Sequence, residues 1–388
     1  MSVPDRKYKI VYCTPGLYLA GGMERVLTLK ANYFADVFGY DVTIILTEGI
    51  DKPYFYPLSD RIKVINLNLG FEALWNQPIL KKIFIYFKKQ RQYKKLLKAA
   101  LMQIRPDITI SMLRREINFL NSIRDGSKKI GEIHINRAHY RTFEEGDSNL
   151  FKSLLSSYWK FTLVRHLKQL DSFVALTQKD KEAWTELDHV AVIPNPVSFP
   201  SVKVSQQTDK RVIAVGRYCY EKGYDHLLKI WAEVQSLCPD WRLDVYGDGD
   251  STAYEQMLDD CQIDRSRCSL NGRVSDVQSV FARSSLAVCS SRFEGFGLAI
   301  VEAMACGLPV VSFDCPWGPR SIISDGEDGI LVENGNIKQF VAAMVKLMKE
   351  NDVREAMGQQ AATNVQRFSM EAVADQWMTL FDSLFRKQ

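Results

Sequence analysis

The chain has 388 residues, of which 46% are hydrophobic and 25% charged, and its formal net charge is +4. This length suggests about two or three domains, and the composition is ordinary for a globular protein. The charge is too small to indicate a nucleic-acid partner. No run approaches the roughly 20 apolar residues of a membrane-spanning helix.

The start of the chain and its cysteines predict a cytoplasmic location. Charged residues lead directly into a short apolar strand, so no secretory signal is expected. None of the eight cysteines belongs to a CxxC pair. We therefore expect reduced thiols rather than disulfides or metal ligands, and no metal or other cofactor.

In the first half of the chain, strand-like apolar runs alternate with helical segments. The strands are expected at 8–13, 41–46, 61–67, 107–112, 128–135, 171–177 and 189–196. The helices are expected at 23–38, 79–104, 115–124 and 178–186. This alternation predicts a parallel sheet with helices on both faces.

A proline-rich and then polar stretch, PNPVSFPSVKVSQQTDK (194–210), predicts a domain linker. The alternation restarts beyond it. Strands are expected at 211–217, 242–247, 268–274, 286–291, 309–314 and 329–333. Helices are expected at 222–237, 251–262, 275–284, 297–306, 336–350 and, as an amphipathic tail, about 369–386.

The pattern predicts an α/β fold with two Rossmann-like domains that face each other across a cleft. The expected divisions are an N-terminal domain (1–195), a linker (196–210), a C-terminal domain (211–368) and a C-terminal helix (369–388). Ligands of such sheets bind outside the carboxyl ends of the strands. The residues that directly follow strands are therefore the candidates for a site.

The stretch RFEGFGLAIVEAMACGLPVV (292–311) follows one of these strands. It places two acids, Glu294 and Glu302, around a glycine turn at the start of a helix. Gly295 and Gly297 permit a tight backbone there. The alternative to a binding role is an acid that complements the helix dipole beside a surface glutamate; the whole string at this spacing favours a site.

The helix start in this stretch suits a particular kind of ligand. The N–H groups of Phe296, Gly297 and Leu298 are expected to point into the cleft with the helix dipole behind them. This arrangement favours an anionic or hydroxyl-rich ligand. A carboxylate such as Glu294 can accept two hydrogen bonds from a vicinal diol.

This string resembles the E-x7-E signature of the family 4 retaining glycosyltransferases, which have the GT-B architecture. The resemblance covers nearly the whole chain, most firmly residues 190–335. Further segments carry it: GGMERV (21–26), VGRYCYEKG (215–223), VYGDGD (245–250), LNGRV (270–274) and GPRSIISDGEDGILV (318–332). It implies a nucleotide-sugar donor in the C-terminal domain, an acceptor in the N-terminal domain, and a C-terminal helix that crosses back to the N-terminal domain.

The resemblance also implies roles for the residues of the string. Glu294 would bind hydroxyls of the transferred sugar, and Glu302 would bind the ribose hydroxyls. The amides of Phe296, Gly297 and Leu298 would contact the sugar and the diphosphate.

Arg217 and Lys222 follow the strand that opens the C-terminal domain. A diphosphate leaving group gains negative charge as the glycosidic bond breaks, and two cations would stabilise it. The alternative is a pair of surface cations at a helix start. No DxD-type motif is evident, since GDGD (247–250) lies in a predicted turn, so we expect no metal.

Gly21 and Gly22 follow the first strand and would let the backbone approach the diphosphate. The surrounding sequence lacks G-x-G-x-x-G spacing, which disfavours an NAD-dependent dehydrogenase. A plain turn is the alternative. Glu24 is expected to complement the helix dipole rather than to touch substrate.

His134 ends a predicted strand, and the resemblance implies that it contacts the donor sugar near the reacting carbon. A structural histidine is the alternative, and His139 is the second candidate for the contact. The backbone of Arg273 and Val274 is expected to line the base pocket.

The resemblance implies a metal-independent hexosyltransferase that retains the anomeric configuration, by a front-face mechanism. A UDP-sugar is the expected donor, and CPWGPRSII (315–323) resembles members that use UDP-galactose-type donors in cell-surface polysaccharide assembly. The acceptor would be a saccharide or a lipid-linked saccharide. The alternatives are a catalytically silent nucleotide-sugar-binding scaffold and a GT-B epimerase, which would need further acid–base residues.

Residues 81–105 hold nine Lys and Arg and no acid. The apolar residues expected on one side of this helix are Ile83, Phe87, Tyr93, Leu97, Leu101 and Ile104. That side would pack on the N-terminal domain or insert into a membrane interface. The basic side would meet anionic lipid, which predicts a peripheral position on the inner face of the cytoplasmic membrane. A solvated helix that covers a core is the alternative.

Overall fold

The computed structural model describes residues 6–74, 78–134, 137, 161–199 and 203–386. The chain divides into two compact units. Unit 1 contains residues 1–194 and 373–388, and unit 2 contains residues 195–372. The strands paired in each described sheet run parallel, and this α/β architecture confirms the predicted fold class.

The described part of unit 1 contains a seven-stranded sheet in the order β3-β2-β1-β4-β5-β6-β7. Its strands are β1 (Lys9–Thr14), β2 (Asp41–Leu46), β3 (Lys63–Asn66), β4 (Ile108–Ser111), β5 (Lys128–Glu132), β6 (Ser172–Ala175) and β7 (Val190–Val192). The strand order reverses between β1 and β4. In open sheets of this kind, that reversal is where ligands bind.

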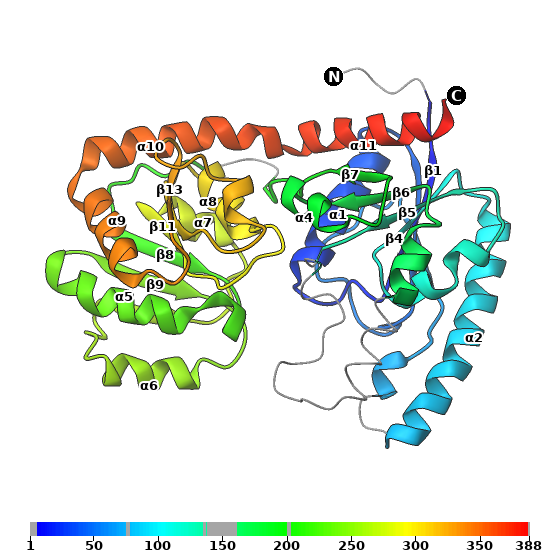
Figure 1. Ribbon diagram of the computed structural model, residues 1–388, viewed down its shortest axis with the longest axis horizontal. Helices are drawn as coiled ribbons and strands as arrows, with labels where there is room; N and C mark the ends of the chain where they lie inside the picture. The colour runs from blue at the N-terminus through cyan, green and yellow to red at the C-terminus, as the bar shows by residue number, and fades with distance from the viewer. Residues whose placement is uncertain (1–5, 75–77, 135–136, 138–160, 200–202, 387–388) are drawn as a thin grey trace. The chain divides into compact units, whose positions relative to one another are not determined.

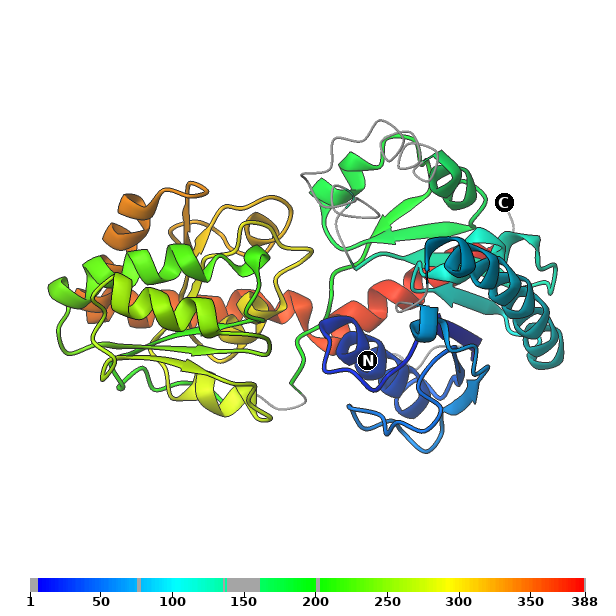
Figure 2. The same cartoon turned by 90° about the horizontal axis from the view of Figure 1, so that it is seen from below.

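Helices cover both faces of the unit 1 sheet (Figures 1 and 2). The helices are α1 (Gly22–Asp36), α2 (Ile79–Ile104), α4 (Gln178–Ala183) and, in large part, α11 (Met370–Phe385). The Tyr8 hydroxyl donates to Oδ1 of Asp382 at 2.6 Å, and the Tyr8 ring stacks on Phe385 with centroids 5.5 Å apart. The C-terminal helix therefore packs in unit 1, as predicted.

The described part of unit 2 repeats the architecture with a six-stranded sheet in the order β10-β9-β8-β11-β12-β13. Its strands are β8 (Arg211–Val215), β9 (Arg242–Tyr246), β10 (Cys268–Asn271), β11 (Leu286–Cys289), β12 (Val310–Phe313) and β13 (Gly329–Val332). The reversal falls between β8 and β11. The loops that follow these two strands therefore occupy the position where the sheet favours a ligand.

Unit 2 also has helices on both faces of its sheet (Figure 1). α5 (Tyr224–Leu237), α6 (Thr252–Asp260) and α9 (Ile337–Lys349) pack together over one apolar cluster. α7 (Val277–Ala282) and α8 (Leu298–Ala305) pack together, and α8 also contacts β11 and β12. α10 (Asn351–Asn364) packs against α8 and α9.

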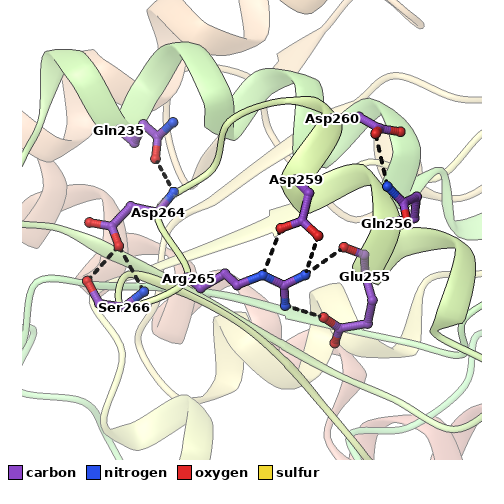
Figure 3. A network of polar contacts seen from close by, with 8 residues as sticks. All are labelled: Gln235, Glu255, Gln256, Asp259, Asp260, Asp264, Arg265 and Ser266. Atoms are coloured by element: carbon purple, nitrogen blue, oxygen red, sulfur yellow. Dashed lines mark hydrogen bonds and ion pairs between the residues drawn. The ribbon is translucent and has the colours of Figure 1, made fainter.

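An ion-pair network joins α6 to the turn that leads into β10 (Figure 3). The Arg265 guanidinium donates to both carboxylate oxygens of Asp259 and to Glu255. The Asp264 carboxylate accepts from the backbone N–H and the hydroxyl of Ser266, at 2.9 and 2.7 Å. These contacts are exposed and lie on the turn rather than in the core.

The predicted helix at 115–124 is wrong. Two 3-10 turns, Arg115–Asn118 and Leu120–Ser122, occupy this segment. Its polar side chains bond to nearby backbone and compete with the helical ladder: the Asn118 amide donates to the Arg115 carbonyl, and the Ser122 hydroxyl to the Phe119 carbonyl.

The sequence analysis missed α10. The buried residues of this helix are Arg354, Met357, Gly358 and Ala361, which follow a helical spacing. Only one of them has a large apolar side chain, so the hydrophobic pattern that predicts a helix is absent.

The predicted linker at 196–210 contacts unit 2 along part of its length. Ser205 N–H donates to the Cys306 carbonyl at 2.8 Å, and the Gln207 side chain donates to the Gly307 carbonyl at 2.7 Å. Both residues are buried, so this segment is part of the packed unit.

The predicted apolar side of α2 packs on the core of unit 1 in its C-terminal half. Tyr93, Leu97 and Leu101 are buried in the core of unit 1. Ile83 and Phe87 are instead exposed by 49% and 59%. Within the described residues, no helix is long and apolar enough to cross a membrane.

Candidate functional site

Two loops meet at the strand reversal of unit 2. One follows β8 and carries Arg217 and Lys222; the other follows β11 and carries Glu294. Lys222 Nζ lies 2.6 Å from Oε1 of Glu294, and the two side chains are 22% and 12% exposed. The structure therefore joins two predicted site residues that are 72 positions apart in the sequence.

A serine completes this cluster. The Ser291 hydroxyl donates to the same Oε1 of Glu294 at 2.7 Å. Burial alone would lower the pKa of Lys222, but the adjacent Glu294 carboxylate raises that pKa above its usual range. The raised pKa keeps Lys222 protonated at neutral pH, and Lys222 and Ser291 both donate to Glu294.

The loops approach so closely that only glycine fits at two positions. Gly223 has φ +62°, and a Cβ there would lie 2.3 Å from the Ser290 carbonyl oxygen. The Ser290 hydroxyl donates to the Lys222 carbonyl at 2.9 Å. A Cβ at Gly318 would lie 2.7 Å from Cβ of Glu294. These contacts fix the backbone on which the lysine and the glutamate stand.

An arginine fork gives further support behind the pair. Arg292 donates to both carboxylate oxygens of Asp225, at 2.8 and 2.6 Å. Its guanidinium also lies 4.2 Å from the centroid of the Tyr220 ring. The sequence analysis missed Ser291, Arg292 and Asp225, because nothing in the sequence indicates that these residues meet.

The glycine turn predicted before α8 is present. Gly297 is the N-cap of α8 with φ +110°, a conformation that favours glycine. Phe296 is buried, whereas Leu298 is partly exposed. The first N–H groups of a helix have no partner within the helix, so this turn can donate to a ligand. Glu302 lies within α8 and is 1% exposed.

The other predicted residues of unit 2 lie nearer to solvent. Arg217 and Arg273 are exposed, and Val274 is partly buried. Arg273 Nη1 lies 3.7 Å from Oδ2 of Asp248, in the turn after β9.

A small cavity of about 20 Å³ lies against the Lys222–Glu294 pair. Its walls include Val215, Tyr224 and Ile300. A volume of this size holds about one water molecule. A nucleotide sugar cannot enter it, so a ligand of that size would have to lie on the exposed side of the pair.

The predicted glycines of unit 1 begin α1. Gly21 is the extended N-cap residue, and Gly22 is the first residue of the helix and is exposed. A Cβ at Gly21 would lie 2.0 Å from Oε2 of Glu24, so this carboxylate lies over the turn. Burial raises the pKa of Glu24, while a bond from its own backbone N–H, Arg114 and His134 lower it. Glu24 is the acid in the first turn of α1, and Arg114, which the sequence analysis did not single out, acts on its carboxylate.

His134 follows β5 at the carboxyl edge of the unit 1 sheet. Its Nε2 lies 3.0 Å from Oε1 of Glu132, and its side chain is 9% exposed. Glu132 also pairs with Lys30 of α1. The alternative candidate, His139, lies outside the described residues.

In the described part of the chain, no group of three or more His, Cys, Asp or Glu side chains is placed to hold a metal ion. All eight cysteines are described, and each is a free thiol.

Residues 209–350 match the family of Glycosyl transferases group 1. The matched residues lie within unit 2 and make up less than half of the chain. The fold of the chain is GT-B, as its solved neighbours show. The glycine turn, Glu294 and Lys222 all fall within the matched residues.

The chain is similar to curated glycosyltransferases along different fractions of their length. It is 27% identical over 374 residues to an uncharacterized glycosyltransferase of Haemophilus influenzae, covering 95% of this chain and 98% of that one. It is 26% identical to a poly(ribitol-phosphate) alpha-N-acetylglucosaminyltransferase of Staphylococcus aureus, over 68% of this chain but only 52% of that one.

A solved structure shares the fold across nearly the whole chain. It is a mutant of Staphylococcus aureus TarM in complex with fondaparinux, alpha-GlcNAc-glycerol and UDP. The TM-score is 0.77 at 17% identity, over 97% of this chain and 100% of that one. At this identity the likeness establishes the fold alone.

Proposed function

We propose that this protein is a family 4 glycosyltransferase that transfers a hexose from a UDP-sugar, with retention of configuration, to a saccharide or lipid-linked saccharide. A galactose-type donor is preferred, and the product belongs to cell-surface polysaccharide synthesis. The observation that carries the proposal is the Lys222–Glu294 pair, which lies at the strand reversal of a unit that matches the group 1 family.

In the Lys222–Glu294 pair, the carboxylate binds the sugar and the ammonium stabilises the diphosphate. Glu294 accepts from Lys222 and Ser291 through Oε1, and its carboxylate binds hydroxyls of the transferred sugar. Lys222 remains a cation because Glu294 raises its pKa. Together with the exposed Arg217, it stabilises the diphosphate as the glycosidic bond breaks.

The surrounding residues bind the rest of the donor. The amides of Phe296, Gly297 and Leu298 donate to the sugar and the diphosphate. Glu302 binds the ribose hydroxyls, and the backbone of Arg273 and Val274 lines the base pocket. In unit 1, Gly21 and Gly22 contact the diphosphate, and His134 contacts the donor sugar.

The reaction needs no metal in this proposal, because two cationic side chains supply the charge that a divalent ion would supply. It follows a front-face path, in which the leaving phosphate helps to deprotonate the acceptor hydroxyl. The protein then accelerates transfer by positioning and electrostatics. This mechanism is the one expected of the metal-independent retaining enzymes whose E-x7-E string this chain resembles.

The N-terminal half of α2 attaches the enzyme to an anionic membrane surface, which places it on the cytoplasmic face. Ile83, Phe84 and Phe87 are exposed by 49%, 73% and 59%. They lie among exposed cations: Lys81, Lys88, Arg91, Lys94 and Lys95. Exposed aromatic residues beside Lys and Arg are typical of helices that lie in a lipid interface.

A thermal-shift panel of UDP, GDP, ADP and their common sugars, with and without EDTA, tests the donor assignment. A ligand that binds only the folded state raises the unfolding midpoint. We expect stabilisation by UDP and one UDP-sugar, unchanged by EDTA. Stabilisation by another nucleotide would overturn the base, and a loss with EDTA would overturn metal independence.

Product analysis separates transfer from simple binding. We expect the selected UDP-sugar to yield UDP and a product with the donor's anomeric configuration, detected by NMR. Binding without turnover over a panel of saccharide and lipid-linked acceptors would favour a silent scaffold. Conversion of the UDP-sugar itself would favour an epimerase.

A further inference from the structure

A buried ion pair in unit 1 has no part in the function described so far. Lys30 of α1 pairs with Glu132 at the end of β5, and the two side chains are 1% and 2% exposed. The Lys30 Nζ also lies 4.5 Å from the centroid of the Trp377 ring of α11. One lysine therefore contacts elements from both ends of the chain.

The pair leads directly to His134. Glu132 and His134 are two positions apart at the end of an extended strand, so both side chains lie on the same side of the sheet. Oε1 of Glu132 accepts from Lys30 and also lies 3.0 Å from His134 Nε2. One carboxylate oxygen thus connects a buried lysine to the histidine.

Glu132 remains ionised in this network. Burial would raise its pKa, but Lys30 and then His134 lower it to about 2. The other titratable groups near the network are Tyr12, on which Glu132 acts, and Glu24, on which His134 acts. The ionised carboxylate has no proton to donate, and it lies 3.0 Å from Nε2 of the imidazole. A lone pair on Nε2 would face another acceptor there, so the carboxylate favours a proton on that nitrogen.

We propose that Lys30 and Glu132 are positioning residues that hold His134 in one ring orientation and one tautomer, with the proton on Nε2. In the neutral ring, Nδ1 is then the acceptor, and it receives a hydrogen bond from a hydroxyl of the donor sugar. This inference rests on the proposed function, because the sugar contact of His134 belongs to it.

Stability is a weak explanation for such a pair. A buried ion pair is often no more stable than apolar residues of similar volume, because both charges lose their hydration. A carboxylate behind a functional imidazole has a specific effect, since it fixes which ring nitrogen carries the proton. Lys30 keeps that carboxylate charged and fixed, and Trp377 packs over Lys30.

The tautomer can be measured without any substrate. Two-bond 1H–15N correlation spectra of protein labelled with 15N-histidine distinguish Nε2–H from Nδ1–H rings, and the spectrum of His134→Asn identifies the signal of His134. We expect the Nε2–H form in the wild-type protein. A wild-type His134 with its proton on Nδ1 would overturn the proposal.

The double variant Lys30→Met/Glu132→Leu removes both charges together, so that no unpaired charge is buried. We expect the His134 tautomers to become mixed while the circular dichroism spectrum is unchanged. Lys30→Met/Glu132→Gln restores an acceptor and should partly restore the Nε2–H form. An unchanged tautomer in the Leu variant would overturn the proposal.

A second buried pair supplies the matched control. Lys129 lies in β5 and Asp125 lies just before it, and their side chains are 7% and 0% exposed. Lys129 pairs with Asp125 rather than with a candidate site residue. Lys129→Met/Asp125→Asn should leave the His134 signal in place. If this control changes His134 as much as the Leu variant does, the effect is general loosening and the proposal fails.

Kinetics then connects the tautomer to transfer. With UDP as the probe, the Kd of the Leu variant by calorimetry should stay within about twofold of wild type, while kcat with the UDP-sugar selected above falls at least about tenfold. An unaltered kcat would overturn the link to the sugar. If no UDP-sugar is turned over by the wild type, the proposed function fails, whereas the tautomer result still tests the positioning.

Discussion

The two units each contain a Lys–Glu pair at the carboxyl edge of a sheet, and the pairs differ in exposure. Lys222 and Glu294 are 22% and 12% exposed, whereas Lys30 and Glu132 are 1% and 2% exposed. A partly exposed pair can exchange its partners for a substrate. A buried pair cannot, so it can affect chemistry only through a neighbour such as His134.

The largest effect is expected from the loss of the Glu294 carboxylate. Glu294→Ala removes the acceptor proposed for the sugar hydroxyls and should lower kcat/KM by roughly 10³-fold, as for other groups that stabilise a transition state. The unfolding midpoint should change little, because the pair is partly hydrated. The assay is UDP release with the selected donor and acceptor.

Glu350→Gln, at an exposed position after α9, is the control for this variant. It should retain wild-type kcat/KM. Glu294→Ala with full activity and a native fold would contradict the assignment of Glu294.

Substitution by methionine should mainly lower stability at Lys30 and mainly lower turnover at Lys222. Lys30→Met leaves Glu132 buried without its main counter-charge and should cost about 3–5 kcal/mol of unfolding free energy. Lys222→Met should cost less, since the pair is partly exposed and Ser291 still donates to Glu294, but it should reduce turnover. Urea unfolding measures both; equal losses of stability would mean that exposure does not distinguish the pairs.

Acid should weaken the buried pair selectively. The pKa of Glu132 is lowered to about 2 in the folded state from 4.5 in the unfolded state. Its ionised form therefore contributes stability above pH 4.5, and this contribution is lost as the pH falls toward 2. At 1.36 kcal/mol per unit, the loss approaches about 3 kcal/mol.

Other titratable groups change the unfolding free energy in the opposite direction as the pH falls. The effect of Glu132 must therefore be measured as a difference between two proteins. Burial raises the pKa of Asp180 to about 6, so its protonation favours the folded state as the pH falls through that range. Urea unfolding at pH 7, 5, 4 and 3 should therefore compare the wild type with Lys30→Met/Glu132→Leu. We expect the wild type to lose more stability below pH 4.5; parallel curves would contradict the role of Glu132.

The sequence indicated Lys222 and Glu294 as site residues, but it did not indicate the buried pair of Lys30 and Glu132. Glu294 and Lys222 lie in short strings whose glycines mark tight loops, and both follow strands. Lys30 lies in the middle of a helix, where lysine is common, and its partner is 102 residues away. Local patterns therefore predicted the parallel sheets and the loops at their edges, while the pairing of Lys30 with Glu132 depends on how α1 packs on β5.

The same reasoning explains the errors at the element level. The segment 115–124 has helical spacing, but side-chain bonds to its backbone favour 3-10 turns. In α2 the spacing placed Phe87 on the same side as Tyr93, but Tyr93 is buried in the core of unit 1 and Phe87 is exposed. The spacing of apolar residues shows which side of a helix packs on a core. It does not show how far along the helix that core extends.

A moderate effect is expected on lipid binding rather than on activity in solution. Charge reversal at Lys88, Arg91, Lys94 and Lys95 should weaken binding to vesicles that contain phosphatidylserine, because each cation near the surface contributes about 1 kcal/mol. Lys89 is left intact, since its ammonium donates to the Leu69 and Gly70 carbonyls. Co-sedimentation measures the bound fraction.

Phe84→Ser/Phe87→Ser should weaken the same binding at high salt, where charge attraction is screened. Charge reversal at the exposed Lys229 and Lys338 of unit 2 is the control and should leave vesicle binding unchanged. Equal binding by all variants would mean that α2 only covers the core.

The smallest effect is expected at the exposed network of unit 2. Arg265 donates to Asp259 and Glu255 at the end of α6 (Figure 3), and its side chain is 50% exposed. Exposed ion pairs contribute little to stability, because water solvates the separated charges nearly as well. Arg265→Gln should therefore leave kcat/KM unchanged and lower the unfolding midpoint slightly at low salt, with the difference vanishing at 1 M NaCl. A calorimetric scan at both salt concentrations measures this, and a loss comparable to that of Lys30→Met would mean that the network, rather than burial, determines which charges hold the fold together.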